Sequence, residues 1–297
     1  MANIPVEYGH AKQPLSYEQR GAQLSPKIIL PEVKNIIAVA SGKGGVGKTT
    51  VTVNLALALQ RQGANVGIFD ADVYGPNVPI MLGIHRHKAA QGLATIARRA
   101  GAGPYIKPLT RFGLNIMSIG LLVAENQVID PARSPDAVGQ LVVQTLQDVL
   151  WGPLDFLLID LPPSAGQPQA ALVQRVPLRG VVIVTTPQDL SLLDASRSLL
   201  MFQEANVPVL GIVENMSYFI CPNCQEKHEI FQRSARWRPE ALADAPILGQ
   251  IPLTTAVSQG INRANPLMHD HPDTPQAEAF TAVTAAMLQQ LAPPTSS

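Results

Sequence analysis

The feature that most constrains this chain is a glycine-rich loop between a strand-like run and a helix-like run. Residues 42–49 read Gly, four further residues and then Gly-Lys-Thr, which is the spacing of a phosphate-binding loop. Residues 35–40 before it are apolar and too few for a helix, so they predict a buried parallel strand. After the loop, apolar residues recur at helical spacing until Gly63, where we expect the helix to end. This strand–loop–helix unit predicts an α/β fold.

The loop residues have the chemistry that phosphate binding requires. Glycines let successive backbone N–H groups turn toward phosphate oxygens, and the following helix contributes the positive end of its dipole. We expect Lys48 to reach the β- and γ-phosphates of ATP and the Thr49 hydroxyl to ligate Mg²⁺. A turn that merely joins a strand to a helix is disfavoured, because strand, spacing and helix occur together. The expected ATP-binding set is Gly42, Lys43, Gly44, Gly45, Val46, Gly47, Lys48, Thr49 and Thr50.

Lys43 is a second lysine, placed where it cannot easily fold back onto the phosphates that Lys48 serves. Residues 43–49, Lys-Gly-Gly-Val-Gly-Lys-Thr, resemble the deviant Walker A ATPases: the nitrogenase iron protein, the Min and Par positioning ATPases and the Mrp-type iron–sulfur carriers. The resemblance implies that Lys43 reaches across a homodimer interface to the partner's nucleotide. There it would act like an arginine finger on the charge that develops in phosphoryl transfer. The alternative is a solvated surface lysine.

Length and composition fit one large domain. The chain has 297 residues, 46% of them hydrophobic, and a formal net charge of zero, so no electrostatic argument favours nucleic acid or an anionic membrane. We find neither a secretory leader pattern nor an apolar run of membrane-spanning length, and expect a cytoplasmic protein. The expected organisation is a loosely ordered arm at 1–34, a single P-loop ATPase domain at 35–292 with a Cys-x-x-Cys insertion near 221–224, and a tail at 293–297.

Strand and helix patterns alternate along the domain. Alternation of this kind predicts a three-layer fold, with helices on both faces of a mostly parallel sheet. We expect the helix at 135–150 to have its N-cap at Ser134, and the helix at 191–205 to have its N-cap within residues 189–191. The further strands are expected at 65–69, 156–159, 181–185, 207–213 and 247–251, and the further helices at 135–150, 191–205 and 274–291.

Three aspartates, Asp70, Asp72 and Asp160, follow expected strands and are candidates for binding Mg²⁺ and positioning water. Asp70 and Asp72 follow one expected strand, and the family resemblance implies that Asp72 positions the attacking water while Asp70 lies on the Mg²⁺ side. Both could instead be turn-forming aspartates. Asp160 ends the apolar run 156–159 in the form of a Walker B strand, and we expect it to contact Mg²⁺ through a water. Residues 161–163, Leu-Pro-Pro, would hold a switch loop close to the γ-phosphate.

Three segments resemble the Mrp-type carriers more than the Min or Par proteins. They are Asp-Ala-Asp-Val-Tyr-Gly-Pro at 70–76, Asp-Leu-Pro-Pro at 160–163 and Val-Glu-Asn-Met-Ser at 213–217, and the resemblance spans about 35–266. It implies that Asn215 contacts adenine, for which its amide offers both a donor and an acceptor. A capping or turn asparagine is the alternative.

The only two cysteines, Cys221 and Cys224, form a Cys-x-x-Cys pair. Such a pair alone is compatible with a redox disulfide, a zinc half-site, an iron–sulfur half-site or unmetallated thiols. One chain cannot supply four thiolates, whereas two copies at a two-fold interface can. Bridging zinc would satisfy the same count, so it is the family resemblance that implies a 4Fe-4S cluster. We leave out His228 as a solvated residue and give the two His-x-His pairs, at 85–87 and 269–271, little weight.

The chain also departs from the carrier pattern. Residues 164–167 read Ser-Ala-Gly-Gln where these carriers usually have Gly-Thr-Gly-Asp. Gln167 cannot act as a base, although glutamine orients water in other phosphoryl-transfer enzymes. Residues 132–135 and the stretch 231–238 after the cysteines also differ from the usual sequences. These changes bear on the hydrolysis rate, switch coupling and client choice, and leave the nucleotide loop and the cysteine pair intact.

The leading hypothesis is an ATP-binding and ATP-hydrolysing homodimer that holds a bridging 4Fe-4S cluster and transfers it to apo iron–sulfur client proteins. One alternative is a Min- or Par-like positioning ATPase. Residues 274–291 disfavour it, because they carry no lysine or arginine for a basic membrane-binding helix. The other alternative is an ATP-binding scaffold with negligible turnover.

Overall fold

The structure is a computed structural model, and most of the expected arm and all of the expected tail lie outside the residues that it describes. His85, His87, Ser134 and the side chain of Gln167 also lie outside them. The described residues are 27–84, 97–98, 104–122, 135–163, 167–221, 223–224, 226–231, 239–254, 257, 259–260 and 263–292.

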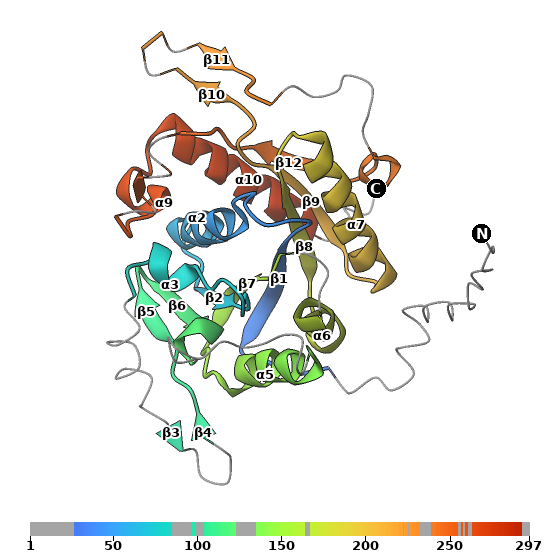
Figure 1. Ribbon diagram of the computed structural model, residues 1–297. Coiled ribbons are helices and arrows are strands. Elements are labelled where there is room, and N and C mark those ends of the chain that lie inside the picture. The colour runs from blue at the N-terminus through green and yellow to red at the C-terminus, as the bar shows by residue number, and fades with distance from the viewer. Residues whose placement is uncertain are drawn as a thin grey trace, which may run out of the picture.

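An eight-stranded sheet runs through the centre of the molecule (Figure 1). Its order is β12-β9-β8-β1-β7-β2-β6-β5, and all neighbours are parallel except the edge pair β5 and β6. The strands are β1 (Val33–Ser41), β2 (Val66–Asp70), β5 (Leu109–Arg111), β6 (Leu114–Ser118), β7 (Leu154–Asp160), β8 (Gly180–Thr185), β9 (Val209–Glu214) and β12 (Ile247–Gln250). The predicted α/β class and the mostly parallel sheet are confirmed.

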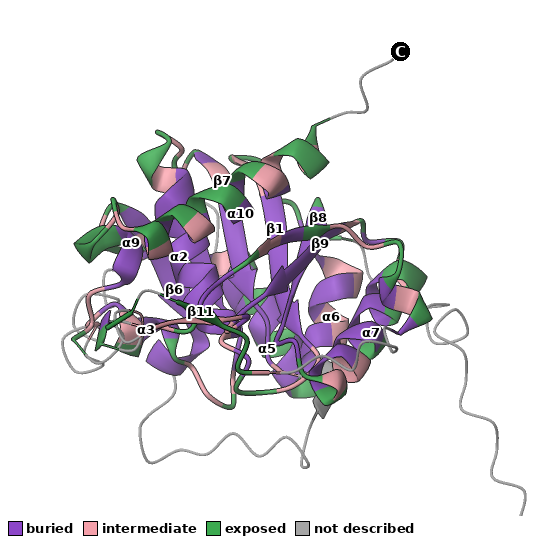
Figure 2. Ribbon diagram, turned by 90° about the horizontal axis from the view of Figure 1, so that it is seen from above, coloured by how far each residue is buried: buried purple, intermediate pink, exposed green. Residues whose placement is uncertain are grey.

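Helices cover both faces of this sheet and complete the three layers. One face carries α5 (Pro135–Asp148), α6 (Gln167–Arg175) and α7 (Asp189–Glu204), and the other carries α2 (Lys48–Arg61), α3 (Val78–Met81), α9 (Leu267–Asp270) and α10 (Pro275–Leu291). Figure 2 shows the central strands almost wholly buried, while exposed residues gather on the outer sides of α7 and α10.

The sequence of β1 follows from its place between two cores. Ile36, Ala38 and Ala40 pack into the core under α5, α6 and α7, whereas Ile37 and Val39 pack into the opposite core. A strand buried on both faces is apolar throughout and does not alternate. This is why residues 35–40 could be recognised as a parallel strand.

Smaller elements complete the fold. The sheet's antiparallel edge was not predicted; Phe112 and Gly113 join β5 to β6 with φ angles of 51° and 76°, the positive values of a tight hairpin turn. No helix in the described ranges has the length and apolar character needed to cross a bilayer. The other short elements are β3 (Ala97–Arg98), β4 (Pro104–Tyr105), β10 (Phe219–Ile220), β11 (Lys227–His228) and the 3₁₀ turns Ile119–Leu121 and Glu240–Leu242.

The N-cap expected for α7 is wrong by one residue. The helix begins at Asp189, and the cap is Gln188, whose side chain makes no capping hydrogen bond. Asp189 instead places a carboxylate in the first turn, where it complements the helix dipole. Ser191 is used internally, because its hydroxyl lies 2.7 Å from the hydroxyl of Thr186.

The glycine that opens the phosphate loop lies directly against the backbone of α7. A Cβ at Gly42 would fall 2.1 Å from the carbonyl carbon of Asp194 and 2.2 Å from its oxygen. A Cβ at Gly44, two residues later, would meet nothing within 4 Å. The loop and α7 therefore touch without an intervening side chain at Gly42.

Gly42→Ala should lower the free energy of unfolding by about 2–3 kcal/mol or more, because the contact is with backbone that cannot rotate away. Urea unfolding monitored by circular dichroism measures this loss. Gly44→Ala is the matched control and should be close to the wild type. Equal stabilities for the two variants would contradict the close packing of the loop on α7.

Candidate functional site

The candidate site lies at the carboxyl ends of β1, β2 and β7. The register of the sheet brings these ends together, since Val39, near the end of β1, and Asp70, the last residue of β2, both pair with Asp160, the last residue of β7. The loop 42–47 leaves β1 at this edge and enters α2. A cavity of about 460 Å³ is lined by Ser41, Lys43, Gly44, Gly45, Val46, Gly47, Lys48, Thr49, Thr50, Asp72, Tyr74, Gly75, Asn77, Met81 and Pro163.

The backbone of the loop requires glycine at two positions. Gly45 and Gly47 have φ angles of 82° and 85°, in the left-handed region. A Cβ at Gly47 would also lie 2.2 Å from Nδ2 of Asn215. The loop can thus turn its N–H groups inward just before the N-terminus of α2, which is the arrangement that binds phosphate.

Asp160 is the buried centre of the site. Its carboxylate is 0% exposed, and its Oδ1 lies 2.8 Å from Nζ of Lys48, which is 6% exposed. Thr49 donates a hydrogen bond to Oδ2 and Thr52 donates one to Oδ1, each at 2.7 Å. Thr52 was missed by the sequence analysis, although its place one helical turn after Lys48 was a signal that could have found it.

The charge of the Lys48 ammonium is neutralised by Asp160, but its hydrogen-bond donors are not satisfied. Despite the 2.8 Å separation from Asp160, Nζ makes no well-aligned hydrogen bond to the residues that the structure describes. An ammonium group has three donors and prefers to satisfy them when buried. Phosphate oxygens entering the cavity would supply the acceptors.

Asp70 lies beneath the cavity and is also 0% exposed. Its oxygens accept hydrogen bonds from the Ser118 hydroxyl at 3.0 Å and from the backbone N–H groups of Asp72 and Val78 at 3.2 and 3.3 Å. Burial, together with the negative charge of Asp160, raises the pKa of Asp70 to about 8, against the opposing effects of Lys48 and these hydrogen bonds. Asp70 is therefore largely protonated at neutral pH in this form.

Asp72 shapes a turn and also lines the cavity. Its Oδ1 accepts hydrogen bonds from the backbone N–H groups of Tyr74 and Gly75, at 3.2 and 3.1 Å, so it does shape a turn. The same side chain lines the cavity, and burial raises its pKa. A carboxylate held by the backbone at the cavity wall suits the predicted orientation of water.

The oxygen atoms at this site fit Mg²⁺. The Thr49 hydroxyl and the carboxylates of Asp70 and Asp160 are the hard oxygen ligands that this ion prefers, alone or through water. They belong to one connected cluster, because Thr49 contacts Asp160 and Asp160 raises the pKa of Asp70. The residues predicted for the metal are thus brought together.

Asn215 contacts the backbone of the loop, whereas Lys43 lines the cavity. Asn215 is buried, and its Nδ2 donates a 2.8 Å hydrogen bond to the carbonyl of Val46, so it supports the loop from behind. Its contact with adenine stays a prediction.

Lys43 is half-buried at the cavity, and no acidic side chain in the described part of the chain forms an ion pair with it. Its ammonium is therefore available.

The two cysteines lie away from this cavity, on the hairpin formed by β10 and β11 (Figure 1). Both thiols are free; Cys221 is half-buried and Cys224 is exposed. The pKa of Cys221 is lowered because its sulfur accepts hydrogen bonds from the backbone N–H groups of Cys224 and Asn223 and from the Cys224 thiol. The structure thus brings the two thiols together and keeps them separate from the nucleotide loop within one chain.

The hairpin holds two more potential ligands that the sequence analysis missed or set aside. Glu226 Oε2 lies 3.8 Å from the Cys224 sulfur and 3.9 Å from Nε2 of His228. The regular two-residue spacing of Cys224, Glu226 and His228 was the available signal. His269, in contrast, packs its ring 4.1 Å from that of Phe112 and bonds to Asn265, which indicates a structural role.

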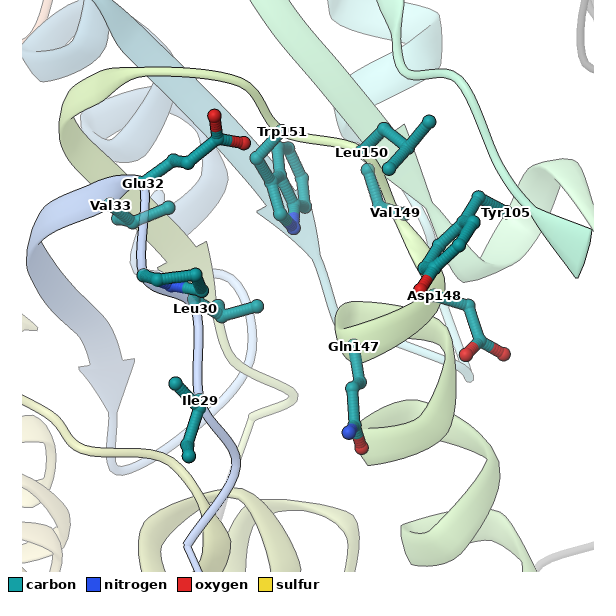
Figure 3. Close-up of a pocket in the computed structure, with 11 residues that line it drawn as sticks. Ile29, Leu30, Glu32, Val33, Tyr105, Gln147, Asp148, Val149, Leu150 and Trp151 are labelled. Atoms are coloured by element: carbon teal, nitrogen blue, oxygen red, sulfur yellow. The ribbon is translucent and has the colours of Figure 1, made fainter. Parts of the chain in front are cut away.

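A second cavity, of about 310 Å³, lies at the opposite end of the sheet (Figure 3). The chain entering β1 and the segment between α5 and β7 form its walls, with the Trp151 ring facing it. Trp151 is held there by donating a hydrogen bond to the carbonyl of Leu146 at 3.0 Å. This cavity is remote from the loop and contains none of the predicted site residues.

The buried Asp70 generates a pH dependence of stability. In the unfolded chain its pKa is about 3.8, and in the folded protein it is about 8. Between these values the folded protein binds more protons than the unfolded chain, so the free energy of unfolding falls as the pH rises. The stabilising contribution is complete below pH 3.8 and is lost as the pH rises through 8.

Asp70→Asn should remove this component, because the amide resembles the neutral carboxyl group and does not titrate. In nucleotide-free buffer with EDTA, the free energy of unfolding of the variant should rise relative to that of the wild type as the pH increases. The expected change is on the order of 1 kcal/mol per pH unit between pH 5 and 8. Denaturant unfolding across this range measures the difference in slope. Asp273→Asn, at an exposed position, should keep the wild-type slope. Parallel pH profiles for Asp70→Asn and the wild type would show that Asp70 titrates normally.

Comparison with known proteins connects this geometry to one family. The ParA family model described as NUBPL iron-transfer P-loop NTPase matches residues 32–288. The iron-sulfur cluster carrier protein of Synechocystis is 44% identical over 253 residues, covering 85% of this chain and 69% of the relative. The carrier of Escherichia coli is 41% identical over 260 residues, covering 88% of this chain and 66% of the relative.

Solved structures agree with the sequence relatives. A nucleotide-binding protein from Archaeoglobus fulgidus, in complex with ADP and with cobalt found, has a TM-score of 0.65 and 31% identity, covering 84% of this chain and 93% of its own. The cell division ATPase MinD of Pyrococcus furiosus has a TM-score of 0.58 and 25% identity, covering 87% and 99%. With the family match over most of its length, the chain belongs to the ParA family, among the NUBPL-type iron-transfer P-loop NTPases.

Proposed function

We propose that this protein is an ATP-hydrolysing iron–sulfur cluster carrier. As a homodimer it would hold a bridging 4Fe-4S cluster between the Cys221 and Cys224 pairs of two subunits and pass it to apo client proteins. The observation that carries the proposal is the combination in one chain of a phosphate loop and two free thiols on a projecting hairpin. Relatives named iron-sulfur cluster carrier proteins support it.

The nucleotide half of the proposal follows from the contacts of Asp160. Its carboxylate contacts both Lys48 and Thr49. ATP phosphates would attract Lys48 away from this ion pair, and Thr49 would be released with it. When bound, Mg²⁺ would neutralise phosphate charge, held by Thr49 and, through water, by Asp160 and Asp70. Asp72, fixed by two backbone N–H groups at the cavity wall, would orient the attacking water.

A homodimer would complete both sites. Lys43 lines the cavity and has no acidic partner in the described residues, which leaves its ammonium free to serve the other subunit's nucleotide. The cysteine pair supplies two of the four thiolates that a 4Fe-4S cluster takes, and a second copy supplies the others. One two-fold axis could satisfy both requirements.

A short chain segment connects the two sites. Asn215 bonds to the loop carbonyl of Val46, and Cys221 follows only six residues later. Between them, Ser217 is anchored because its N–H donates to Ile251 at 2.9 Å. A loop movement that shifts Val46 would therefore act on the base of the thiol hairpin, which offers a route from nucleotide state to cluster retention.

Lys43→Ala should reduce ATP hydrolysis by about 100-fold or more while leaving nucleotide binding by the monomer nearly unchanged, because the lysine acts on the partner's transition state. Steady-state phosphate release and equilibrium binding of a fluorescent ATP analogue separate the two effects. Lys107→Ala, at an exposed site, is the control. A wild-type rate in Lys43→Ala would contradict the trans role, and a wild-type rate in Lys48→Ala would favour a scaffold with negligible turnover.

Anaerobic reconstitution with iron and sulfide should load about one 4Fe-4S cluster per two chains, because each chain contributes two thiolates. Visible and Mössbauer spectroscopy identify the cluster, and sedimentation gives the mass of the loaded species. The Cys221→Ser/Cys224→Ser double variant removes the ligands at the hairpin while leaving the nucleotide cavity intact. The carrier proposal fails if the wild type retains no more iron and sulfide than this variant.

A further inference from the structure

The thiol hairpin contains more ligands than a bridging cluster uses. One donor atom from each of Cys224, Glu226 and His228 lies within 4.8 Å of the others. The Cys224 sulfur and Nε2 of His228 lie 3.8 and 3.9 Å from Glu226 Oε2. In a tetrahedral zinc site, unlike donors lie about 3.3–3.5 Å apart, given Zn–S near 2.3 Å and Zn–N or Zn–O near 2.0 Å. The two donor pairs that include Glu226 therefore need to close by only about half an ångström.

The backbone explains why these side chains face one another. Cys224 lies in the turn of the hairpin, Glu226 directly precedes β11 and His228 ends it, so the fold of the hairpin carries all three donors. The hairpin fixes this register, because Phe219 pairs with His228 and the Cys221 N–H donates to the carbonyl of Glu226 at 3.0 Å. The ligand face is thus set by hydrogen bonds that do not involve the ligand atoms.

The neighbouring positive charge is kept on the other side of the strand. Lys227 stands between Glu226 and His228, and its ammonium lies 4.0 Å from the centre of the Tyr218 ring. This cation–π contact holds Lys227 away from the face that carries the donors. A cation approaching Glu226 and His228 therefore does not meet a competing ammonium.

Cys221 lies outside this group of three donors but next to one of its members, so it is placed to supply the fourth donor. Its sulfur accepts a hydrogen bond from the Cys224 thiol, so the two sulfurs are already neighbours. Two thiolates, one imidazole and one carboxylate form a complete tetrahedral set for Zn²⁺ and similar borderline-soft cations. Hard cations such as Mg²⁺ and Ca²⁺ avoid thiolates, so this set discriminates against them.

We propose that each protomer alone binds one Zn²⁺-class divalent cation through Cys221, Cys224, Glu226 and His228. The site uses the same thiols as the proposed cluster, but it does not require that a cluster is ever held. The two forms of the hairpin exclude each other. A single chain closes the coordination sphere with Glu226 and His228, whereas a cluster takes its remaining ligands from the partner's thiols. A zinc-loaded hairpin would thus block cluster loading and thiol-mediated pairing of subunits.

Cobalt titration of the full-length, reduced, metal-free protein tests this site. The wild type should bind one Co²⁺ per chain and show the intense visible bands of tetrahedral thiolate coordination. Its sedimentation should be the same with and without the metal. Zn²⁺ should displace the cobalt. X-ray absorption of the zinc form should show two sulfur and two nitrogen or oxygen neighbours. One cation per two chains, or four sulfur neighbours, would overturn the proposal in favour of a bridging ion.

Matched variants distinguish ligands from bystanders. Glu226→Gln and His228→Gln should each weaken Co²⁺ binding at least 10-fold and alter the visible spectrum, whereas Glu229→Gln, exposed one residue beyond His228, should behave as the wild type. Unchanged affinity and spectrum in both ligand variants would overturn the assignment. The same two variants should still load a cluster if the carrier proposal holds, so failure of the zinc site and failure of the carrier function give different results.

Discussion

A single buried carboxylate organises the nucleotide end of this molecule. Asp160 is removed from water, and burying such a charge is costly unless it is paired and hydrogen-bonded. Lys48, Thr49 and Thr52 together meet this requirement, and all three come from the first turns of α2. The carboxylate therefore fixes the helix that follows the loop to the central strand β7. The loop takes its shape between these two fixed ends.

The same interaction explains the unusual state of Asp70. The register of β2 on β7 places it next to Asp160, and Lys48 can balance only one of the two buried charges. Burial and the neighbouring charge of Asp160 therefore raise the pKa of Asp70. The wall of the site thus has a charge that depends on its occupants, which fits a pocket that must accept a highly anionic ligand.

An element of the fold could be predicted from the sequence when its own residues determine it, and could not when it depends on contacts with distant segments. β1 was recognisable because burial on both faces makes residues 36–40 wholly apolar. The loop was recognisable because its motif is contiguous in the sequence. The edge strand β5 was missed, since its three residues Leu109–Arg111 gain strand character only by pairing with β6. The cap of α7 was misplaced because Asp189 suits both a cap and a first turn.

The same distinction applies to the residues of the candidate site. Asp160 and the loop could be assigned from their own segments, whereas the contacts of Asp70 with Ser118 and of Asn215 with Val46 depend on which strands become neighbours. His228 was set aside as solvated because a lone histidine carries little information in sequence. The regular spacing of Cys224, Glu226 and His228 gains meaning only in the folded hairpin, where their donor atoms lie within 4.8 Å of one another.

The short passage from Asn215 to Cys221 acts as a tether of fixed length. Six residues of fully extended chain span at most about 20 Å, so Cys221 cannot move farther than that from the residue that supports the loop. If two chains share one cargo between their hairpins, the two phosphate loops are confined to a separation of roughly twice this reach plus the width of the cargo. Occupation of the hairpins would then raise the effective concentration of one nucleotide site near the other, without any contact between the two ATPase domains.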